Sequence, residues 1–198
     1  MYNWRKMTEE QRDDVLRLRK QQKQPWHSPP HREGIRTRYI ITATCYEHKH
    51  HIGYSIDRIS KFEKELLEKI AGFVDELYGW VILPNHYHLL IKTENLFPLI
   101  KELQALHGKN SFYWNKEENC KGRKTWFNVL EKSIKSDNHF CAALNYIHHN
   151  PVKHKYVNKW TDWAFSSARD YIKEHGRENV INQWNNYDIS DMGKGWDI

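Results

Sequence analysis

The sequence contains few cysteines and no long apolar segment. Its three cysteines, Cys45, Cys120 and Cys141, show no Cys-x-x-Cys spacing, so neither a disulfide framework nor a zinc knuckle is expected. We interpret them as reduced thiols of a cytoplasmic protein. No apolar run approaches 18 residues, and no apolar segment marks the N-terminal region. We therefore expect neither a membrane span nor a secretion signal.

Positive charge is concentrated near the N-terminus. Of the net charge of +6, residues 1–38 carry +5, since they hold ten Lys and Arg against five Asp and Glu. The chain also holds nine Trp and eleven Tyr in 198 residues. A basic chain suits a polyanionic partner, and exposed aromatic rings suit stacking on unpaired bases, although most of them should lie in the core.

Residues 1–35 differ in composition from the rest of the chain. Thr8 and Gln11 have the spacing of a capping box, which predicts the start of a charged helix that extends to about Lys23. The segment 25–30 contains three prolines and cannot be a helix or a central strand. We predict a basic helical arm followed by a Pro-rich linker, in which Trp26 anchors the chain.

The remaining sequence predicts an α+β domain over residues 36–172 and a loop-rich tail that includes residues 173–198. Its apolar periodicity indicates strands at 38–46, 78–83, 86–93 and 125–130, and helices at 56–77, 96–114 and 137–149. The first six elements follow the βαββαβ order of a ferredoxin-like sandwich. The two inner helices would cover one face of an antiparallel sheet, and the last helix, which Pro151 ends, would cross the open face.

Two histidines lie two residues apart in the predicted strand at 86–93. His86 and His88 should project side by side, about 7 Å apart, because alternate residues of a strand share a face. Tyr87 should face the core instead. Such a pair can share a metal ion, or it can simply be two polar residues of a half-buried strand.

The last helix carries the residues that would complete a site. Tyr146 and Asn150 are one helical turn apart and lie together on one flank of the apolar stripe. If this helix crosses the open sheet face, both side chains can reach the cavity of His86 and His88. A single helical tyrosine is otherwise an ordinary packing residue.

This set of side chains suits phosphoryl transfer. A phenol is a poor nucleophile at neutral pH, but it can attack a phosphodiester when a divalent metal polarises the phosphate. Two imidazoles and an amide oxygen suit Mg²⁺ or Mn²⁺, and imidazole nitrogen would also admit zinc. The product is a covalent phosphotyrosine and a free 3′-OH. Because no water is consumed, another 3′-OH can reverse the step and join new ends.

The motifs that contain these residues resemble those of a known family. Leu83–Leu90 (LPNHYHLL) and Leu144–Val152 (LNYIHHNPV) resemble the HUH single-tyrosine transposases, and most closely the REP-associated tyrosine transposases. The resemblance extends from about Tyr39 to Tyr171. It includes Phe165-Ser166-Ser167, which fits a Trp-Ser-Ser-like element with Phe in place of Trp.

This resemblance implies a fold, an activity and a set of site residues. We expect a ferredoxin-like, metal-dependent endonuclease and strand transferase that acts on single-stranded DNA beside hairpins such as repetitive extragenic palindromes. By motif position His86, His88 and Asn150 would bind Mg²⁺ or Mn²⁺, and Tyr146 would form a 5′-phosphotyrosine. The expected partners are single-stranded DNA and DNA hairpins, and no membrane. The protein would be cytoplasmic and nucleoid-associated, and either a monomer or a homodimer.

Basic residues outside these motifs are candidates for DNA contacts. Arg123 and Lys124 could hold the backbone while a base stacks on Trp126, or this segment could be a surface loop. Lys153 and Lys155 could bind phosphate or belong to a solvated turn. The N-terminal arm could lie along a hairpin stem or be a solvated helix.

Three functions remain open from the sequence. The first is the active transesterase. The second is a domesticated DNA-hairpin binding protein without transposition activity. The third is a metal hydrolase that uses water as its nucleophile and would not need Tyr146.

Overall fold

The computed structural model describes residues 8–11, 13, 14, 17, 37–187, 189 and 192. The chain divides into two compact units, one of residues 1–33 with 193–198 and the other of residues 34–192. In the first unit Thr8 and Gln11 exchange the two hydrogen bonds of a capping box, which confirms that prediction. The predicted linker at 25–30, with Trp26, lies outside the described residues.

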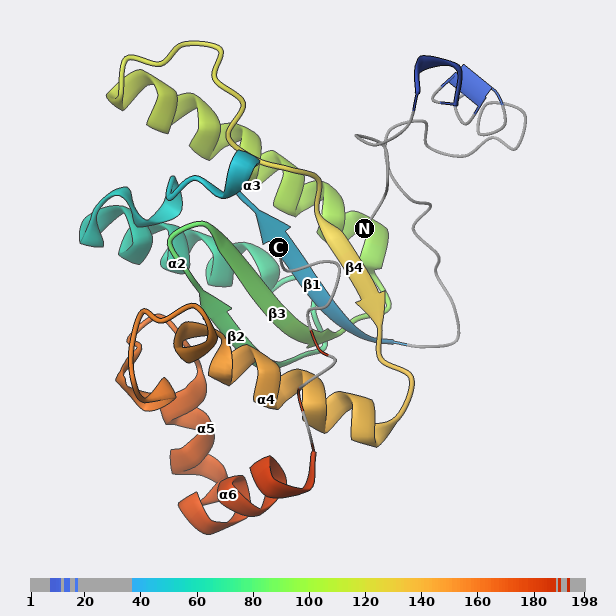
Figure 1. Ribbon diagram of the computed structural model, residues 1–198, viewed down its shortest axis with the longest axis vertical. Coiled ribbons are helices and arrows are strands. Elements are labelled where there is room, and N and C mark those ends of the chain that lie inside the picture. The colour runs from blue at the N-terminus through green and yellow to red at the C-terminus, as the bar shows by residue number, and fades with distance from the viewer. Residues whose placement is uncertain are drawn as a thin grey trace. The chain divides into compact units, whose positions relative to one another are not determined.

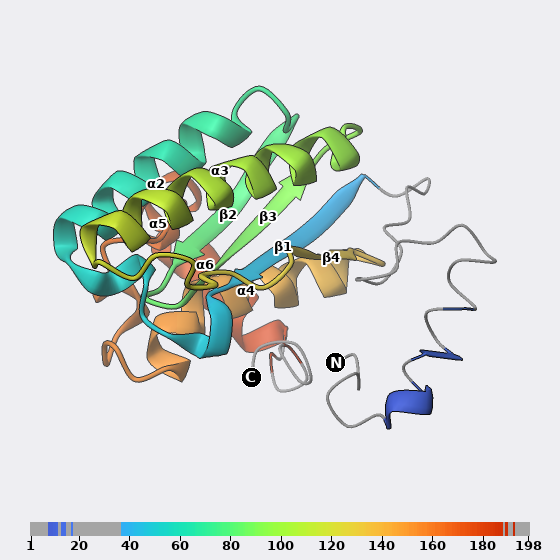
Figure 2. The same ribbon diagram turned by 90° about the horizontal axis from the view of Figure 1, so that it is seen from above.

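The second unit is built on one antiparallel sheet (Figure 1). The strand order is β2-β3-β1-β4, and the sheet comprises β1 (Arg38–Thr44), β2 (Glu76–Ile82), β3 (His86–Lys92) and β4 (Leu130–Ser133). Helices α2 (Ile56–Ile70) and α3 (Leu96–Glu117) cover one face, and α4 (Asp137–Lys153) crosses the other, as Figure 2 shows. This arrangement confirms the predicted ferredoxin-like fold with an additional helix on the open face.

The main core lies between the sheet and helices α2 and α3. In β3, alternation sends Tyr87, Leu89 and Ile91 into this core, which they share with Phe62 of α2 and Leu103 of α3. Helix α2 is capped by Ser55 and ends at Ile70. The prediction extended it to Leu77, which instead belongs to the following strand, β2.

The fourth strand lies further along the chain than predicted. In the segment predicted as a strand, 125–130, only Trp126 forms a bridge, with Cys45, and the continuous ladder begins at Leu130. The register shifts by one residue between the Cys45–Trp126 bridge and the Thr42–Leu130 pair. Such a register shift interrupts the hydrogen bonds between the two strands but leaves the apolar residues of the segment in place, so the sequence pattern does not reveal it.

Helix α4 begins and ends differently from the prediction. Its N-cap is Ser136, whose hydroxyl accepts a hydrogen bond from the His139 amide, and Asp137 is the first helical residue. Pro151 does not end the helix, which continues to Lys153. The end is a Schellman motif in which Lys155 has a φ of 61° and the Tyr156 amide donates to the Pro151 carbonyl.

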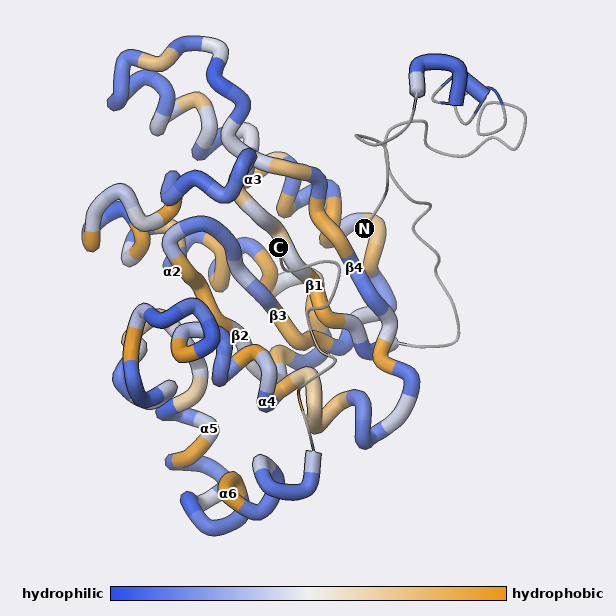
Figure 3. Tube along the Cα trace, viewed as in Figure 1, coloured by the Kyte–Doolittle hydropathy of each residue, from blue (hydrophilic) through white to orange (hydrophobic). Residues whose placement is uncertain are grey.

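The expected loop-rich tail instead contains two helices. They are α5 (Ala168–His175) and α6 (Arg177–Asn186), which are mostly hydrophilic with scattered apolar residues (Figure 3). Gln183 of α6 exchanges side-chain and backbone hydrogen bonds with the buried Asn145 of α4. The sequence prediction was wrong here because a few separate contacts, and no apolar stripe, hold α6 on α4: the Asn145–Gln183 hydrogen bonds and the Trp184 ring, 5.3 Å from the His149 ring.

The cysteines and the helix lengths bear on the expected thiols and on the expectation of no membrane span. Cys45, Cys120 and Cys141 are free thiols. Within the described segments, no helix has the length and apolar character that a membrane crossing needs.

Candidate active site

The two histidines of β3 project from the sheet toward α4. Their ring centroids are 5.0 Å apart, and neither side chain is more than 2% exposed. His88 Nδ1 is 2.8 Å from the Thr42 hydroxyl on the neighbouring strand. That contact fixes the ring and leaves Nε2 as the nitrogen that can coordinate a metal. The predicted pairing of His86 and His88 on one face is confirmed.

Helix α4 brings Tyr146 and Asn150 to the same place. The Tyr146 ring lies 5.3 Å from the His88 ring, and Asn150 Oδ1 lies 2.9 Å from His86 Nε2. Both α4 residues are buried, at 1% and 0% exposure. Two side chains of the strand and two of the helix therefore meet in space, although His86 and Asn150 are 64 residues apart in the sequence.

His86 lies between more hydrogen-bond acceptors than a neutral imidazole can satisfy. Its Nδ1 lies 2.7 Å from Asn85 Oδ1 while its Nε2 faces Asn150 Oδ1, so the ring lies between two amide oxygens. A neutral imidazole has one N–H and can satisfy only one of them. Asn150 Nδ2 is buried and has no hydrogen-bond partner within the described part of the chain, so this N–H donor is open to an oxygen atom of a ligand.

One pair of the candidate donor atoms has a spacing that a metal could bridge. Neighbouring ligands of an octahedral ion with bonds of about 2.1 Å are about 3.0 Å apart, and His86 Nε2 and Asn150 Oδ1 are 2.9 Å apart. Over the described residues, no group of three or more His, Cys, Asp or Glu side chains is arranged for a metal. A metal centre would therefore consist of two imidazoles, one amide oxygen and open positions.

A cation from the end of α4 lies over the tyrosine. Lys153 Nζ is 4.9 Å from the centre of the Tyr146 ring, and the Lys153 side chain is exposed. A positive charge at this distance favours negative charge on the phenol oxygen. Lys153 is thus placed to influence Tyr146, in addition to its predicted role as a phosphate contact.

The neighbouring tyrosine of β3 is in a different environment. Tyr87 is fully buried in the main core, and its hydroxyl is 3.1 Å from His107 Nε2. Burial raises the pKa of Tyr87 and lowers that of His107 to about 3, so both are neutral at physiological pH. The prediction that Tyr87 faces the core is confirmed.

Other residues of the matched motifs hold α4 against the sheet. The buried His148 contacts the Ser167 hydroxyl through Nε2 at 3.1 Å, and burial lowers the pKa of His148 to about 3. Ser167 in turn accepts a hydrogen bond from the Trp80 amide. The segment 165–167 pairs with the outer edge of β2, since the Ile82 amide donates to the Phe165 carbonyl.

Sequence reasoning missed two side chains that line the site, Thr42 and Asn85, which hold the two histidines. The His154 ring also lies beside the site, 4.9 Å from the His86 ring. Thr42 is recognisable only from the strand pairing, because it lies opposite His88 in the register. Asn85 could have been found from the sequence, as it directly precedes His86.

The predicted DNA contacts have different outcomes. Trp126 is buried, and its ring stacks on His107 at 4.0 Å, so the prediction that a base stacks on it is wrong. Arg123 is bound to Glu118 and Asn115. Lys124, Lys153 and Lys155 are exposed, as a phosphate contact requires, and their role stays a prediction.

The fold and the site together define a class of protein. A four-stranded antiparallel sheet carries a histidine pair, and a helix on its open face carries a tyrosine and an asparagine to that pair. These are the features that the sequence motifs led us to expect of the HUH single-tyrosine transposases.

Comparisons with known proteins agree with that class. The chain is 29% identical over 136 residues to a protein of Haemophilus influenzae described as a putative REP-associated tyrosine transposase, covering 61% of this chain and 74% of that protein. A solved REP-associated tyrosine transposase bound to a REP hairpin matches with a TM-score of 0.61 and 18% identity, over 84% of this chain and 95% of that one. No protein-family model matches. The chain is related to the REP-associated tyrosine transposases.

Proposed function

We propose that the protein is a metal-dependent endonuclease and strand transferase that acts on single-stranded DNA beside hairpins. The observation that supports this most strongly is the convergence of Tyr146 from α4 and Asn150 from the same helix on His86 and His88 of β3. The kinship with a protein described as a transposase, and the fold shared with a transposase solved on a REP hairpin, support the choice of DNA as substrate.

Each side chain of the site has a separate role in the proposed reaction. His86, His88 and Asn150 would hold Mg²⁺ or Mn²⁺, which would polarise the scissile phosphate and offset the charge that develops on it. The Tyr146 oxygen attacks phosphorus, so that a Tyr–O–P bond forms and the P–O3′ bond breaks. The phenol proton passes to solvent, and the departing 3′ oxygen takes a proton from solvent. Lys153 stabilises the phenol oxygen as it loses its proton.

The energy of the broken bond is retained in the phosphotyrosine. A 3′-OH from another strand can attack that phosphorus, release the Tyr146 oxygen and form a new phosphodiester. Cleavage and joining are thus the same step in opposite directions, as transposition requires.

One observation favours a second function. All four site side chains are at most 2% exposed, so a phosphodiester reaches them only after neighbouring atoms move. A protein that binds DNA hairpins without cutting them has no need for an open site. The hydrolase with a water nucleophile has no such support, because it leaves the position of Tyr146 without a role.

Incubation with single-stranded oligonucleotides and Mg²⁺ separates these functions. We expect a covalent protein–DNA adduct that is lost in Tyr146→Phe. Binding without cleavage would establish the second function instead. Cleavage that survives Tyr146→Phe and leaves no adduct would establish the hydrolase.

A further inference from the structure

A cluster of two aromatic rings and a lysine lies beside the candidate active site. The rings of Tyr46 and Phe127 have centroids 4.9 Å apart, and Lys124 Nζ lies 4.6 Å from the first and 5.6 Å from the second. Both rings are half-buried, and Lys124 is exposed. A basic group beside aromatic rings on a surface is the combination with which proteins bind unpaired nucleotides.

The strand pairing places these rings on the same face of the sheet as the histidines. Cys45 and Trp126 form a bridge, and both side chains point into the main core. Side chains alternate along an extended chain, so Phe127, the neighbour of Trp126, points to the opposite face. Tyr46 begins the 3-10 turn Tyr46–His48 that follows, and its ring lies against Phe127 on that face. That is the face of His86, which lies opposite Thr44.

The same pairing gives the distance between the cluster and the site. The Phe127 amide donates to the Thr44 carbonyl at 2.9 Å, while Thr44 is paired on its other side with His86. Phe127 is therefore two strand spacings, about 10 Å, from His86. A nucleotide next to a phosphate held at His86 is within reach of both rings.

The loop that carries Tyr46 is held to the turn before His86. Asn85 Nδ2 donates to the His48 carbonyl at 3.3 Å, and the Cys45 amide donates to the Asn85 carbonyl at 2.7 Å. Glu47 and His48 both have a φ of 55°, a conformation that residues with a side chain adopt only when surrounding contacts impose it. The backbone that carries Tyr46 is thus fixed relative to the turn before His86.

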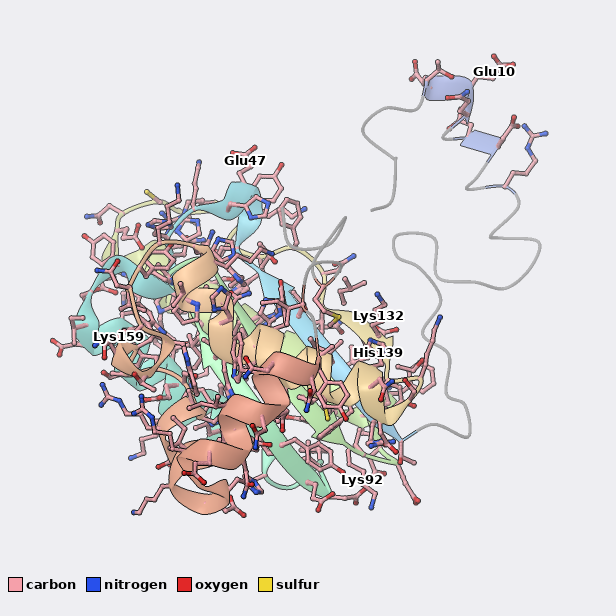
Figure 4. The ribbon with its side chains drawn as sticks, turned by 60° about the horizontal axis from the view of Figure 1, so that its bottom comes forward. Glu10, Glu47, Lys92, Lys132, His139 and Lys159 are labelled. Atoms are coloured by element: carbon pink, nitrogen blue, oxygen red, sulfur yellow. The ribbon has the colours of Figure 1, made fainter. Side chains whose placement is uncertain are left out.

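The charge of the loop is compatible with DNA. Glu47 points outward at the edge of the molecule (Figure 4), and its carboxylate lies 3.6 Å from Lys49 Nζ. This acid is therefore offset by its own neighbour, and Lys124 remains the cation over the rings.

We propose that Tyr46, Phe127 and Lys124 form a nucleotide-binding site of single-stranded DNA, in which a base stacks on the rings and Lys124 contacts the adjacent phosphate. The proposal rests on the proposed function, because the strand it binds is the one whose phosphate reaches His86. The site would hold the substrate strand in register with the nucleophile without selecting its sequence, since every base has a face that can stack.

Equilibrium binding tests this site in the full-length protein. The probe is a fluorescently labelled single strand of mixed sequence, measured by anisotropy in the Tyr146→Phe background so that no strand is cut. Tyr46→Ala should weaken binding by about 5- to 150-fold, whereas Tyr46→Phe should retain it. Tyr113→Ala is the matched control, because Tyr113 is an exposed aromatic residue of α3 that contacts Phe112, and it should change nothing.

The salt dependence distinguishes the ring from the cation. Lys124→Gln should lower the slope of log K against log salt by about 0.7, while Tyr46→Ala should leave that slope unchanged. A strand containing 5-iodouracil should photocrosslink to Tyr46 or Phe127 in the unmutated chain, a result that does not depend on how any variant folds.

The outcomes for this site and for the proposed function differ. If the Tyr146 adduct forms but Tyr46→Ala binds as tightly as its parent, or crosslinks map only elsewhere, the nucleotide site is overturned and the proposed function stands. If the parent protein binds no single-stranded DNA at all, both are overturned.

Discussion

The two faces of the sheet each place a tyrosine against a histidine, with opposite consequences. On the core face Tyr87 meets His107 among apolar rings, including Phe62 and Trp126. On the other face Tyr146 meets His88, and Asn150 and Lys153 lie beside them. The two pairs differ in geometry, because the Tyr87 hydroxyl meets His107 Nε2 at 3.1 Å, whereas the Tyr146 and His88 rings meet edge to face with centroids 5.3 Å apart. The buried hydroxyl of the first pair is used in packing, and the second pair lies among polar and charged neighbours.

The two tyrosines should respond differently to loss of the hydroxyl. Tyr146→Phe should abolish the covalent adduct, because it removes the attacking oxygen while the ring and its packing remain. Tyr87→Phe should retain the adduct and lower the free energy of unfolding by about 1–3 kcal/mol, because it leaves buried His107 without its partner. Denaturing gels of the adduct and urea unfolding measure the two effects. Loss of the adduct in both variants at equal stability would contradict the assignment of the faces.

Two asparagines of α4 provide a comparison for the metal. Asn150→Ala should lower the affinity for Mn²⁺ by at least about tenfold, because it removes an oxygen from the proposed centre. Asn145→Ala, a buried residue that binds α6 instead, should leave that affinity unchanged although it destabilises the fold. Titration calorimetry in the absence of DNA measures both. Equal affinities in the two variants would remove Asn150 from the metal site.

The core face should also show a dependence on pH. Because burial lowers the pKa of His107 from 6.5 to about 3, the unfolded chain binds a proton in this range that the folded chain does not. Stability contributed by neutral His107 is therefore full above pH 6.5 and is lost as the pH falls toward 3, by up to about 1.4 kcal/mol for each pH unit. His107→Leu should flatten the dependence of the urea midpoint on pH. An unchanged slope would show that His107 is protonated in the folded state.

The attachment of α4 can be loosened without touching the core face. A Cβ at Gly79 of β2 would lie 2.5 Å from Leu144 Cδ1, and Leu144 is too deeply buried to move freely. Gly79→Ala should therefore cost about 1–3 kcal/mol and slow adduct formation, because it displaces the helix that carries Tyr146. Gly72→Ala, with open space around the added Cβ, is the control and should affect neither. Normal adduct formation in Gly79→Ala would show that the position of α4 is not critical.

The sequence contained enough to predict the fold and the centre of the site. Strand and helix periodicity placed His86 and His88 on one face, Tyr87 on the other, and Tyr146 and Asn150 on one flank of a helix. Each of these depends on local geometry that two or four residues define.

What the sequence could not reveal depends on long-range contacts. Trp126 follows a basic segment but is turned into the core by its bridge to Cys45, and no local pattern indicates that bridge. Helix α6 is held on α4 by the hydrogen bond of Gln183 to Asn145 and by the contact of Trp184 with His149, and neither pair follows from a local sequence pattern. Thr42 joins the site only through its register with His88.

The central claim is that two imidazoles of the sheet and an amide of α4 hold one cation beside Tyr146. A crystal grown with Mn²⁺ and measured for anomalous scattering tests it directly. We predict one strong peak within coordination distance of His86 Nε2, His88 Nε2 and Asn150 Oδ1, on the side of the Tyr146 ring. A bound Mn²⁺ ion found away from this pair of histidines, or on only one of them, would contradict the account.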